Sequence, residues 1–117
     1  MPDNRYFKIV KLPRAFVVEL VLPEDIDTAA FTEINGALIE QWPIDTGANV
    51  VIDLASTQYL GSMLLGLLVN IRHEAKTRSG QVVLCNVPTP ISKVIRSTNL
   101  ERLIVITGTR AEALGRF

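Results

Sequence analysis

The amino-acid sequence predicts an α/β fold: a mixed sheet of four to five strands with an antiparallel N-terminal hairpin, parallel later strands and about four helices. Two observations lead to this prediction. From residue 27 onward, short β-branched segments alternate with segments of helical periodicity, and strands joined through helices run parallel through right-handed crossovers. The 117 residues, 48% hydrophobic and 21% charged, suffice for one core, so we expect a single domain over residues 1–117.

A β-hairpin is predicted at the start of the chain. Residues 7–11 and residues 15–22 are apolar and rich in β-prone side chains. Pro13 and Arg14 stand between them, and this spacing and turn chemistry are typical of two antiparallel strands joined by a short turn.

The first helix is predicted over about residues 29–41, where apolar residues recur at helical spacing. Asp27 or Thr28 can cap its first amide groups, because a short polar side chain there accepts their hydrogen bonds. Pro43 and Gly47 follow the periodic segment, so we expect the helix to end before them.

The middle of the chain predicts a strand, a helix and a strand in that order. Residues 49–54 are β-branched and apolar on both faces, which is typical of a central strand covered on each side. A helix is predicted from Ser62 to about Arg78, with the end signal at Ser79 and Gly80. Residues 81–86 predict a second buried strand.

The last third of the chain predicts two short helices around a final strand. Thr89 is expected to cap a helix that has Pro90 at its first position. Residues 103–106 predict the last strand, and Thr109 and Glu112 have the spacing of a capping box that starts a C-terminal helix. The strand order does not follow from this pattern.

Few residues indicate enzyme chemistry. The sequence has no glycine-rich phosphate loop and no nucleophile elbow, and it contains one cysteine and one histidine. We expect Cys85 to fill the core and His73 to face solvent. No cofactor and no metal site are therefore predicted. An enzyme that depends on His73 or Asp53 remains a third hypothesis.

The charges give no case for direct nucleic-acid binding, because twelve basic and twelve acidic residues cancel. Residues 1–60 carry a net charge of minus five, from four Lys/Arg and nine Asp/Glu, whereas residues 61–117 carry plus five, from eight and three. This asymmetry either orients a partner or is diluted when the two halves intermix in the fold. The longest apolar run, residues 63–69, is too short for membrane insertion. The N-terminus lacks a secretory signal and the single cysteine suits a reducing compartment, so a cytoplasmic protein is expected.

The predicted helix at Ser62 is apolar nearly all round in its first two turns. Its expected sheet-facing stripe comprises Leu64, Leu67, Leu68, Ile71 and Ala75. Met63 then lies near the start of the helix, and Leu65 and Val69 share an outward sector with Arg72 and Lys76. Either a neighbouring helix of the same fold covers these residues or they dock another protein.

Ser62 stands where the first helix amides lack intrahelical partners. Its hydroxyl can accept one of these N–H groups as a cap, and capping alone would explain the residue. The same amides and the positive end of the helix dipole also accommodate a phosphate. Reversible phosphorylation of Ser62 is thus a chemically suitable switch, because the added charge would oppose docking beside Met63 and Leu65.

Across nearly its whole length the chain resembles the STAS domain of bacterial anti-sigma factor antagonists and stressosome proteins. The resemblance rests on segments 50–54, 59–68, 80–84, 89–95 and 111–114. It implies four or five strands backed by several helices, cytoplasmic partner switching, and no catalysis by the domain itself.

At the helix start, the family commonly has Asp-Ser-Ser-Gly or Asp-Ser-Thr-Gly with a phosphorylated serine or threonine. This chain has Gly61, Ser62, Met63 and Leu64 there, so Ser62 is the remaining acceptor, and a bulky residue follows it as in stressosome components. Asp27 matches a family aspartate in the loop before the first helix. The resemblance therefore implies a partner-binding surface; its candidate residues are Asp27, Gly61, Ser62, Met63, Leu65 and Val69.

The leading hypothesis is a non-enzymatic, anti-sigma factor antagonist-like partner switch. Its partner would be an anti-sigma factor or related serine kinase, and phosphorylation of Ser62 would release that partner. The alternative is an unregulated STAS scaffold or transporter-associated subunit, in which Gly61 and Met63 reflect a loss of regulation. Whether the protein forms a homo-oligomer stays open.

Overall fold

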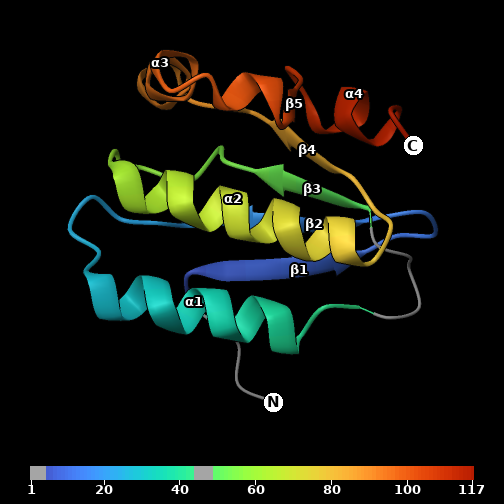
Figure 1. Cartoon of the computed structure of the whole chain (residues 1–117), viewed down its shortest axis with the longest axis horizontal. Helices are drawn as coiled ribbons and strands as arrows, with labels where there is room; N and C mark the ends of the chain where they lie inside the picture. Colours follow the sequence, from blue (N-terminus) through green and yellow to red (C-terminus); the bar gives the residue numbers. More distant parts are fainter. Residues whose placement is uncertain (1–4, 44–48) are drawn as a thin grey trace.

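A five-stranded mixed sheet forms the centre of the protein (Figure 1). The computed structural model describes residues 5–43 and 49–117. The strands are β1 (Phe7–Lys11), β2 (Phe16–Leu20), β3 (Val50–Asp53), β4 (Val82–Cys85) and β5 (Val105–Ile106). They lie in sequence order; β1 and β2 pair antiparallel, and every later neighbour pairs parallel. The predicted mixed sheet with its N-terminal hairpin is therefore confirmed.

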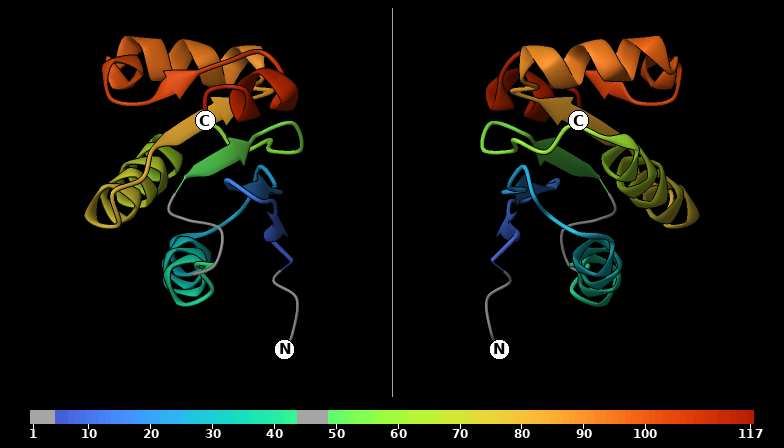
Figure 2. Two further views of the ribbon diagram at one scale, coloured as in Figure 1. Left: turned by 90° about the vertical axis from the view of Figure 1, so that its right-hand side faces the viewer. Right: turned by 90° about the vertical axis from the view of Figure 1, so that its left-hand side faces the viewer.

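Four α-helices and one 3₁₀-helix connect and cover the strands. They are α1 (Thr28–Glu40), α2 (Ser62–Thr77), α3 (Thr89–Ser97), the 3₁₀-helix η1 (Leu100–Arg102) and α4 (Arg110–Leu114). Figure 2 shows α1 and α2 together on one side of the sheet and α4 on the other side. The common side of α1 and α2 follows from the right-handed crossovers that join β2 to β3 and β3 to β4, whereas α4 follows the last strand and belongs to no crossover.

The main core lies between the sheet and α1 and α2, and α3 and η1 complete it. In β2, for example, Phe16, Val18 and Leu20 point into this core, and at most 1% of each residue is exposed. The buried residues of α2 are Leu64, Leu67, Leu68, Ile71 and Ala75. They are the residues of the predicted stripe, so the helical periodicity located the sheet-facing side of α2 correctly.

The opposite face of the sheet has a smaller core under α4. Val17, Val51, Val83 and Cys85 are fully buried there against Ala113 of α4. Burial raises the pKa of the Cys85 thiol to about 12, and the nearby Asp53 charge adds to this shift. Cys85 therefore lies in the core as a neutral thiol, as predicted.

The predicted strands are all present; β1 has the predicted bounds, and the other four are shorter than the segments that predicted them. The segment 15–22 forms β2 over Phe16–Leu20, because Ala15 belongs to the turn, where its carbonyl accepts from Leu12 N–H at 2.9 Å. The expected strand at residues 103–106 was wrong at its start. Leu103 instead follows η1, its amide donating to the carbonyl of Leu100, and β5 has only two residues.

The ends of α1 and α2 agree with their predicted signals. Asp27 is the N-cap of α1, and the helix ends at Glu40, before Pro43; Gly47, the second expected stop signal, lies outside the described residues. After α2 it is Ser79, with φ of 62°, that takes the left-handed conformation, and Gly80 N–H donates to the carbonyl of Ala75 at 2.7 Å. This αL residue satisfies the helix end where a glycine would be usual.

The predicted N-cap is correct for α4 and wrong by one residue for α3. Thr109 caps α4: its hydroxyl accepts from the amide of Glu112 at 3.1 Å. Thr89, however, is the first residue of α3 and Pro88 is its N-cap, with no side-chain cap. Pro90 has no N–H to cap, so the helix start depends less on a polar side chain there.

Candidate functional site

The loop from β3 to α2 is held against the end of β2 by hydrogen bonds to its backbone. The buried Thr57 hydroxyl donates to the carbonyl of Leu20 at 2.8 Å. Two further bonds go to the carbonyl of Leu22, from Gln58 N–H at 2.8 Å and from Tyr59 N–H at 3.1 Å. These contacts place the first residues of α2 beside the loop that precedes α1.

Ser62 is the first residue of α2, and its side chain is exposed. Gly61, not Ser62, is the N-cap, and no side chain caps this helix. The predicted capping role of the Ser62 hydroxyl is therefore wrong: Gly61 takes the extended cap conformation, so Ser62 already belongs to the helix. Within the described residues, the hydroxyl has no hydrogen-bond partner.

The amide groups around Ser62 leave room for an anion at the start of α2. Leu64 N–H donates to the carbonyl of Gly61 at 3.2 Å. The N–H groups of Ser62 and Met63 have no acceptor among the residues that the structure describes. Unpaired amides at the positive end of a helix dipole favour negative charge.

Tyr59 packs over the backbone of Gly61. A Cβ atom at position 61 would come within 2.5 Å of the Tyr59 hydroxyl oxygen. The Tyr59 ring also meets the Phe31 ring edge to face, with 4.9 Å between the ring centroids. An aspartate at position 61, as the family commonly has, would thus require this ring to move.

The other predicted surface residues divide between two sides of α2. Met63, half-buried, lines a hollow between α1 and α2 together with Thr28 and Phe31. Leu65, half-buried, and Val69, exposed, line a hollow between α2 and the segment of α3 and η1. Neighbouring helices of the same fold therefore cover these side chains in part and leave the rest of their surface open.

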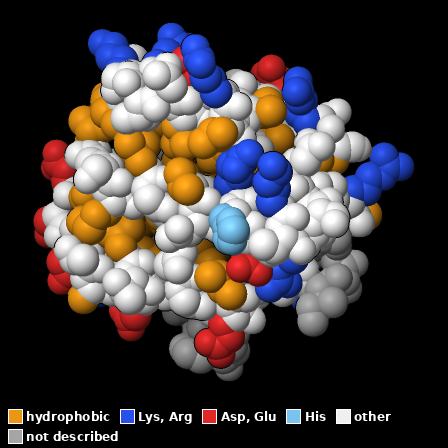
Figure 3. Space-filling model, viewed as in Figure 1, with side chains coloured by type: hydrophobic (Ala, Val, Ile, Leu, Met, Phe, Trp, Pro, Cys, Tyr) orange, Lys and Arg blue, Asp and Glu red, His pale blue; other side chains and the backbone are white. Residues whose placement is uncertain are grey.

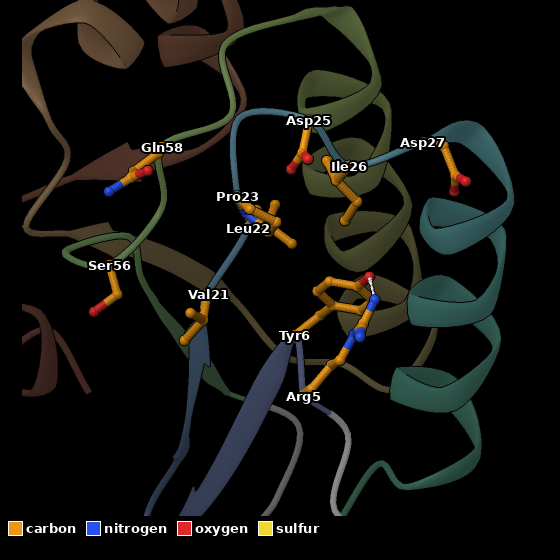
Figure 4. Close-up of a pocket in the computed structure, with 10 residues that line it drawn as sticks. All are labelled: Arg5, Tyr6, Val21, Leu22, Pro23, Asp25, Ile26, Asp27, Ser56 and Gln58. Carbon is orange, nitrogen blue, oxygen red and sulfur yellow. Dashed lines mark hydrogen bonds between the residues drawn. The ribbon is translucent and has the colours of Figure 1, made fainter.

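Asp27 is brought to the same end of the sheet as Ser62, and its side chain is exposed. Its Oδ1 accepts from the Ala30 amide at 2.9 Å, which explains the residue as a helix cap. Asp27 also lines an open hollow of about 570 Å³ with Ser56 and Gln58 of the β3–α2 loop (Figure 4). Asp27 and the β3–α2 loop thus share one edge of the molecule, whereas Leu65 and Val69 lie further along α2.

Several residues of this hollow were not predicted from the sequence. Arg5 and Tyr6, which hydrogen-bond to each other, form its lower wall in Figure 4, and Asp25 lies above them. The hollow offers carboxylate, amide and hydroxyl groups that could bind polar groups of a partner. No sequence signal indicates it, because its walls come from three segments that only the fold brings together.

A second polar cluster lies at the far face of the sheet, under α4. Asp53 Oδ2 accepts from Arg110 Nη2 at 2.9 Å and from the side-chain Nδ2 of Asn86 at 3.1 Å. Arg110 Nη2 also donates to Glu19 Oε2 at 2.8 Å. Burial alone would raise the pKa of Asp53. The Ala55 amide at 3.0 Å, together with Arg110 and Asn86, outweighs burial and holds the pKa below its usual value of 3.8.

The cluster of Asp53, Arg110, Glu19 and Asn86 has a structural role. The bond to Glu19, followed by that to Asp53, raises the pKa of Arg110. These hydrogen bonds from the guanidinium fasten α4 to β2 and β3. His73, the other residue of the enzyme hypothesis, is exposed on α2, as predicted. In the described part of the chain, no three or more His, Cys, Asp or Glu residues are placed to hold a metal ion. None of the helices described is both long and apolar enough to cross a membrane.

Comparisons with solved structures show similar folds. A Thermotoga maritima protein described as an anti-sigma factor antagonist has a TM-score of 0.77 and 21% identity, covering 96% of this chain and 94% of its own. SpoIIAA, an anti-sigma factor antagonist, has a TM-score of 0.75 in its unphosphorylated form, with 20% identity and 94% coverage of both chains. The phosphorylated form of SpoIIAA, from Bacillus, has a TM-score of 0.65 and 19% identity, covering 94% of this chain and 97% of its own.

Sequence comparisons point to the same group. A Thermotoga neapolitana protein whose name assigns it to the anti-sigma factor antagonists is 28% identical over an alignment of 85 residues, which covers 68% of this chain and 75% of the relative. The family model of the STAS domain matches residues 6–113, which is nearly the whole chain. This chain therefore belongs to the STAS domain family.

Proposed function

We propose that this chain is a non-enzymatic partner switch of the anti-sigma factor antagonist type, acting in the cytoplasm. Its partner is an anti-sigma factor or a related serine kinase. The observation that carries the proposal is the exposed Ser62 hydroxyl at the first position of α2, which has no hydrogen-bond partner among the described residues. The family relatives named as anti-sigma factor antagonists support the choice of partner.

The docking surface comprises Asp27, Gly61, Ser62, Met63, Leu65 and Val69. Around Ser62 the surface is apolar: Met63 and Leu65 are half-buried and Val69 is 40% exposed. A partner that covers these side chains gains from their removal from water. The acidic Asp27 and the polar β3–α2 loop lie at the same edge and would orient the partner.

Phosphorylation of Ser62 would release the partner. A phosphate adds a charge of about minus 1.5 to minus 2 at neutral pH. At the start of α2 this charge faces the free amides of Ser62 and Met63, so the helix tolerates it. A partner seated on Met63 and Leu65 would have to desolvate the phosphate, which opposes binding.

The switch is tested by phosphorylation of the full chain. We expect that the serine kinase encoded nearest to this chain's gene, with ATP, adds one phosphate, detected by intact-mass measurement. Ser62→Ala should abolish the addition. Ser56→Ala is the matched control, because Ser56 is also exposed, in the loop before α2. Phosphate that persists in Ser62→Ala would show that the acceptor is another residue.

Partner release is tested by binding. Ser62→Asp should weaken binding to the same kinase by about tenfold or more, equivalent to about 1.4 kcal/mol. Ser97→Asp, at an exposed serine of α3 that lines none of the hollows described, should bind as the unchanged protein does. Equal affinity of Ser62→Asp and the unchanged protein would contradict release by charge and would favour constitutive binding.

The alternative function is an unregulated scaffold or transporter-associated subunit. It is favoured by one observation: Tyr59 fills the space beside Gly61 where the family commonly has an aspartate. Affinity purification of the full chain from its own cells distinguishes the two functions. Recovery of membrane transporter components in place of a soluble kinase would support the alternative.

A further inference from the structure

Two adjoining hollows follow the side of α2 that faces η1 and β5. The first, of about 450 Å³, lies between α2 and the segment of α3 and η1, and Leu65, Val69 and Leu103 line it. The second, of about 290 Å³, is lined by Arg72, Lys76, Leu103 and Val105 among others. Leu103 lines both hollows, so they adjoin at this residue and together make one extended surface groove. We call it the α2–η1 groove; its defining residues are Leu65, Val69, Arg72, Lys76, Leu103 and Val105.

The floor of the α2–η1 groove is apolar and open to solvent. Leu103 is 50% exposed, Val69 40% and Val105 37%. Each of these values is high for a large apolar side chain, whereas Leu100 and Ile104 beside them are buried. Apolar side chains that gather in an open groove indicate a surface that another molecule covers.

The rim of the groove is basic. Arg72 is held in place because its Nε donates to the carbonyl of Leu103 at 2.8 Å. Lys76 lies one turn further along α2 and is exposed, and it forms no ion pair with any described residue. The residues described as lining the two hollows include no Asp or Glu. Figure 3 shows this face, with blue side chains beside an orange patch.

We propose that the α2–η1 groove binds an acidic amphipathic helix of a protein partner. The inference rests on the proposed function, because the groove shares Leu65 and Val69 with the proposed docking surface and specifies the kind of partner segment that binds there. The positive rim selects carboxylates, and the apolar floor selects an apolar stripe at helical spacing. From Leu65 to Lys76, α2 extends about 16 Å at 1.5 Å per residue, which matches about three turns of a partner helix.

A second copy of this chain fits the groove less well. A symmetric dimer uses the same patch on both subunits. Centred on this groove, with the two α2 helices antiparallel, such a dimer would place Lys76 of one copy against Leu65 of the other. The lysine would then lose water without gaining a carboxylate partner, which opposes that arrangement.

The test is an NMR titration of the full, isotope-labelled chain with two synthetic peptides. Both are stapled 14-residue helices with the same leucine stripe, flanked by glutamates in one and by lysines in the other. The glutamate peptide should shift the amide signals of Leu65, Val69 and Leu103 and bind about tenfold or more tighter than the lysine peptide at low salt. Its affinity should fall as salt is added.

Two sets of variants separate the apolar and the charged contributions. Val69→Ser combined with Leu103→Ser should abolish binding of the glutamate peptide. Leu60→Ser is the matched control, because Leu60 is 52% exposed and lines neither hollow. Arg72→Gln combined with Lys76→Gln should remove the preference for the glutamate peptide. Circular dichroism melting checks that each variant folds. If the variant with both serine substitutions does not fold, Val69→Ser alone is used in the titration.

Several results would overturn the proposal. They are equal affinity for both peptides, signal shifts confined to other surfaces, and no shift at millimolar peptide. Sedimentation that shows a dimer dissociated by Val69→Ser would assign the groove to a second copy instead. The titration involves no kinase, so a failure of Ser62 phosphorylation leaves it intact, and a failure of peptide binding leaves the Ser62 experiments intact.

Discussion

Tyr59 and Gly61 determine the shape of the surface just before Ser62. The Tyr59 ring rests on the Gly61 backbone and meets Phe31 edge to face. Gly61 is extended, with φ of −177°, so its backbone does not require a glycine. The need for glycine comes from the ring above it, and the ring therefore stands beside the proposed phosphorylation site.

At this residue, Gly61→Ala should displace the Tyr59 ring. The new Cβ atom would otherwise lie 2.5 Å from the Tyr59 hydroxyl oxygen. Loss of the contact with Phe31 should lower the free energy of unfolding by about 0.5–1.5 kcal/mol. Chemical denaturation gives this value, and the NMR signals of the Tyr59 ring report the movement.

Gly66→Ala is the control for this substitution. Nothing lies within 4 Å of a Cβ atom at position 66, inside α2. Alanine should therefore raise the free energy of unfolding by about 0.5–1 kcal/mol through helix propensity. If Gly61→Ala left the Tyr59 signals unchanged, the proposed role of the ring would be wrong.

At the scale of elements, α1 and α2 begin by different means. Asp27 caps α1 through its side chain, whereas Gly61 begins α2 without one. The start of α1 is thus stabilised by a side chain, whereas at the start of α2 the Ser62 hydroxyl and the first amides have no partner among residues 5–43 and 49–117. This difference makes the start of α2 the better place for a modification that leaves the fold intact.

Asp27→Ala should destabilise α1, because the Ala30 amide loses its acceptor at 2.9 Å. We expect the free energy of unfolding to fall by about 0.5–2 kcal/mol, measured by chemical denaturation. Asp27→Asn should retain most of the stability, since asparagine is an equally good cap. Comparison of the two variants in partner binding then separates the charge of Asp27 from its structural role.

Thr28→Ala is the matched control for the cap. Thr28 is the first residue of α1 and is exposed, and its carbonyl, not its hydroxyl, accepts from Thr32. Its replacement should change stability by no more than about 0.5 kcal/mol. Equal losses in Asp27→Ala and Thr28→Ala would show that the cap contributes little.

At the scale of the whole molecule, the charged cluster under α4 fastens the end of the chain to the sheet. Arg110 from α4 reaches Glu19 of β2 and Asp53 of β3. Asn86, which follows β4 with φ of 52°, completes the hydrogen bonding of Asp53. These hydrogen bonds therefore link α4 to β2, to β3 and to the residue that follows β4.

Asp53→Asn should lower the free energy of unfolding at pH 7 by about 1–3 kcal/mol, because Arg110 loses a charged partner. The pKa of Asp53 lies below 3.8 in the folded protein. A lowered carboxyl pKa stabilises the fold above the unfolded value, and this contribution disappears as pH falls through the folded value. The stability difference between the two proteins should therefore narrow as pH falls below 3.8 and close once Asp53 is protonated in the folded protein, measured by denaturation across pH.

Glu74→Gln is the control for this pH dependence. Glu74 pairs with Arg78 at 2.8 Å on the surface of α2, where both side chains retain solvent contact. Its replacement should change stability by about 0–1 kcal/mol. If Asp53→Asn remained less stable than the unchanged protein at low pH, where Asp53 is protonated, the proposed role of the Asp53 charge would be wrong.

The candidate site was only partly predictable from the sequence. The exposed position of Ser62 and the outward sector of Leu65 and Val69 follow from helical periodicity, and both are present. The cap at Gly61 and the ring of Tyr59 above it were not predicted. They depend on how the β3–α2 loop turns against Leu20 and Leu22, and no local pattern encodes that contact.

The sequence by itself determined the order and type of the elements, the mixed sheet and the buried side of α2. These features depend on residues that are near one another in the chain, through capping, turn chemistry and periodicity. Only the tertiary structure decided the strand order, the cluster of Glu19, Asp53 and Arg110, and the α2–η1 groove. Their members lie far apart in the chain, so packing alone brings them together.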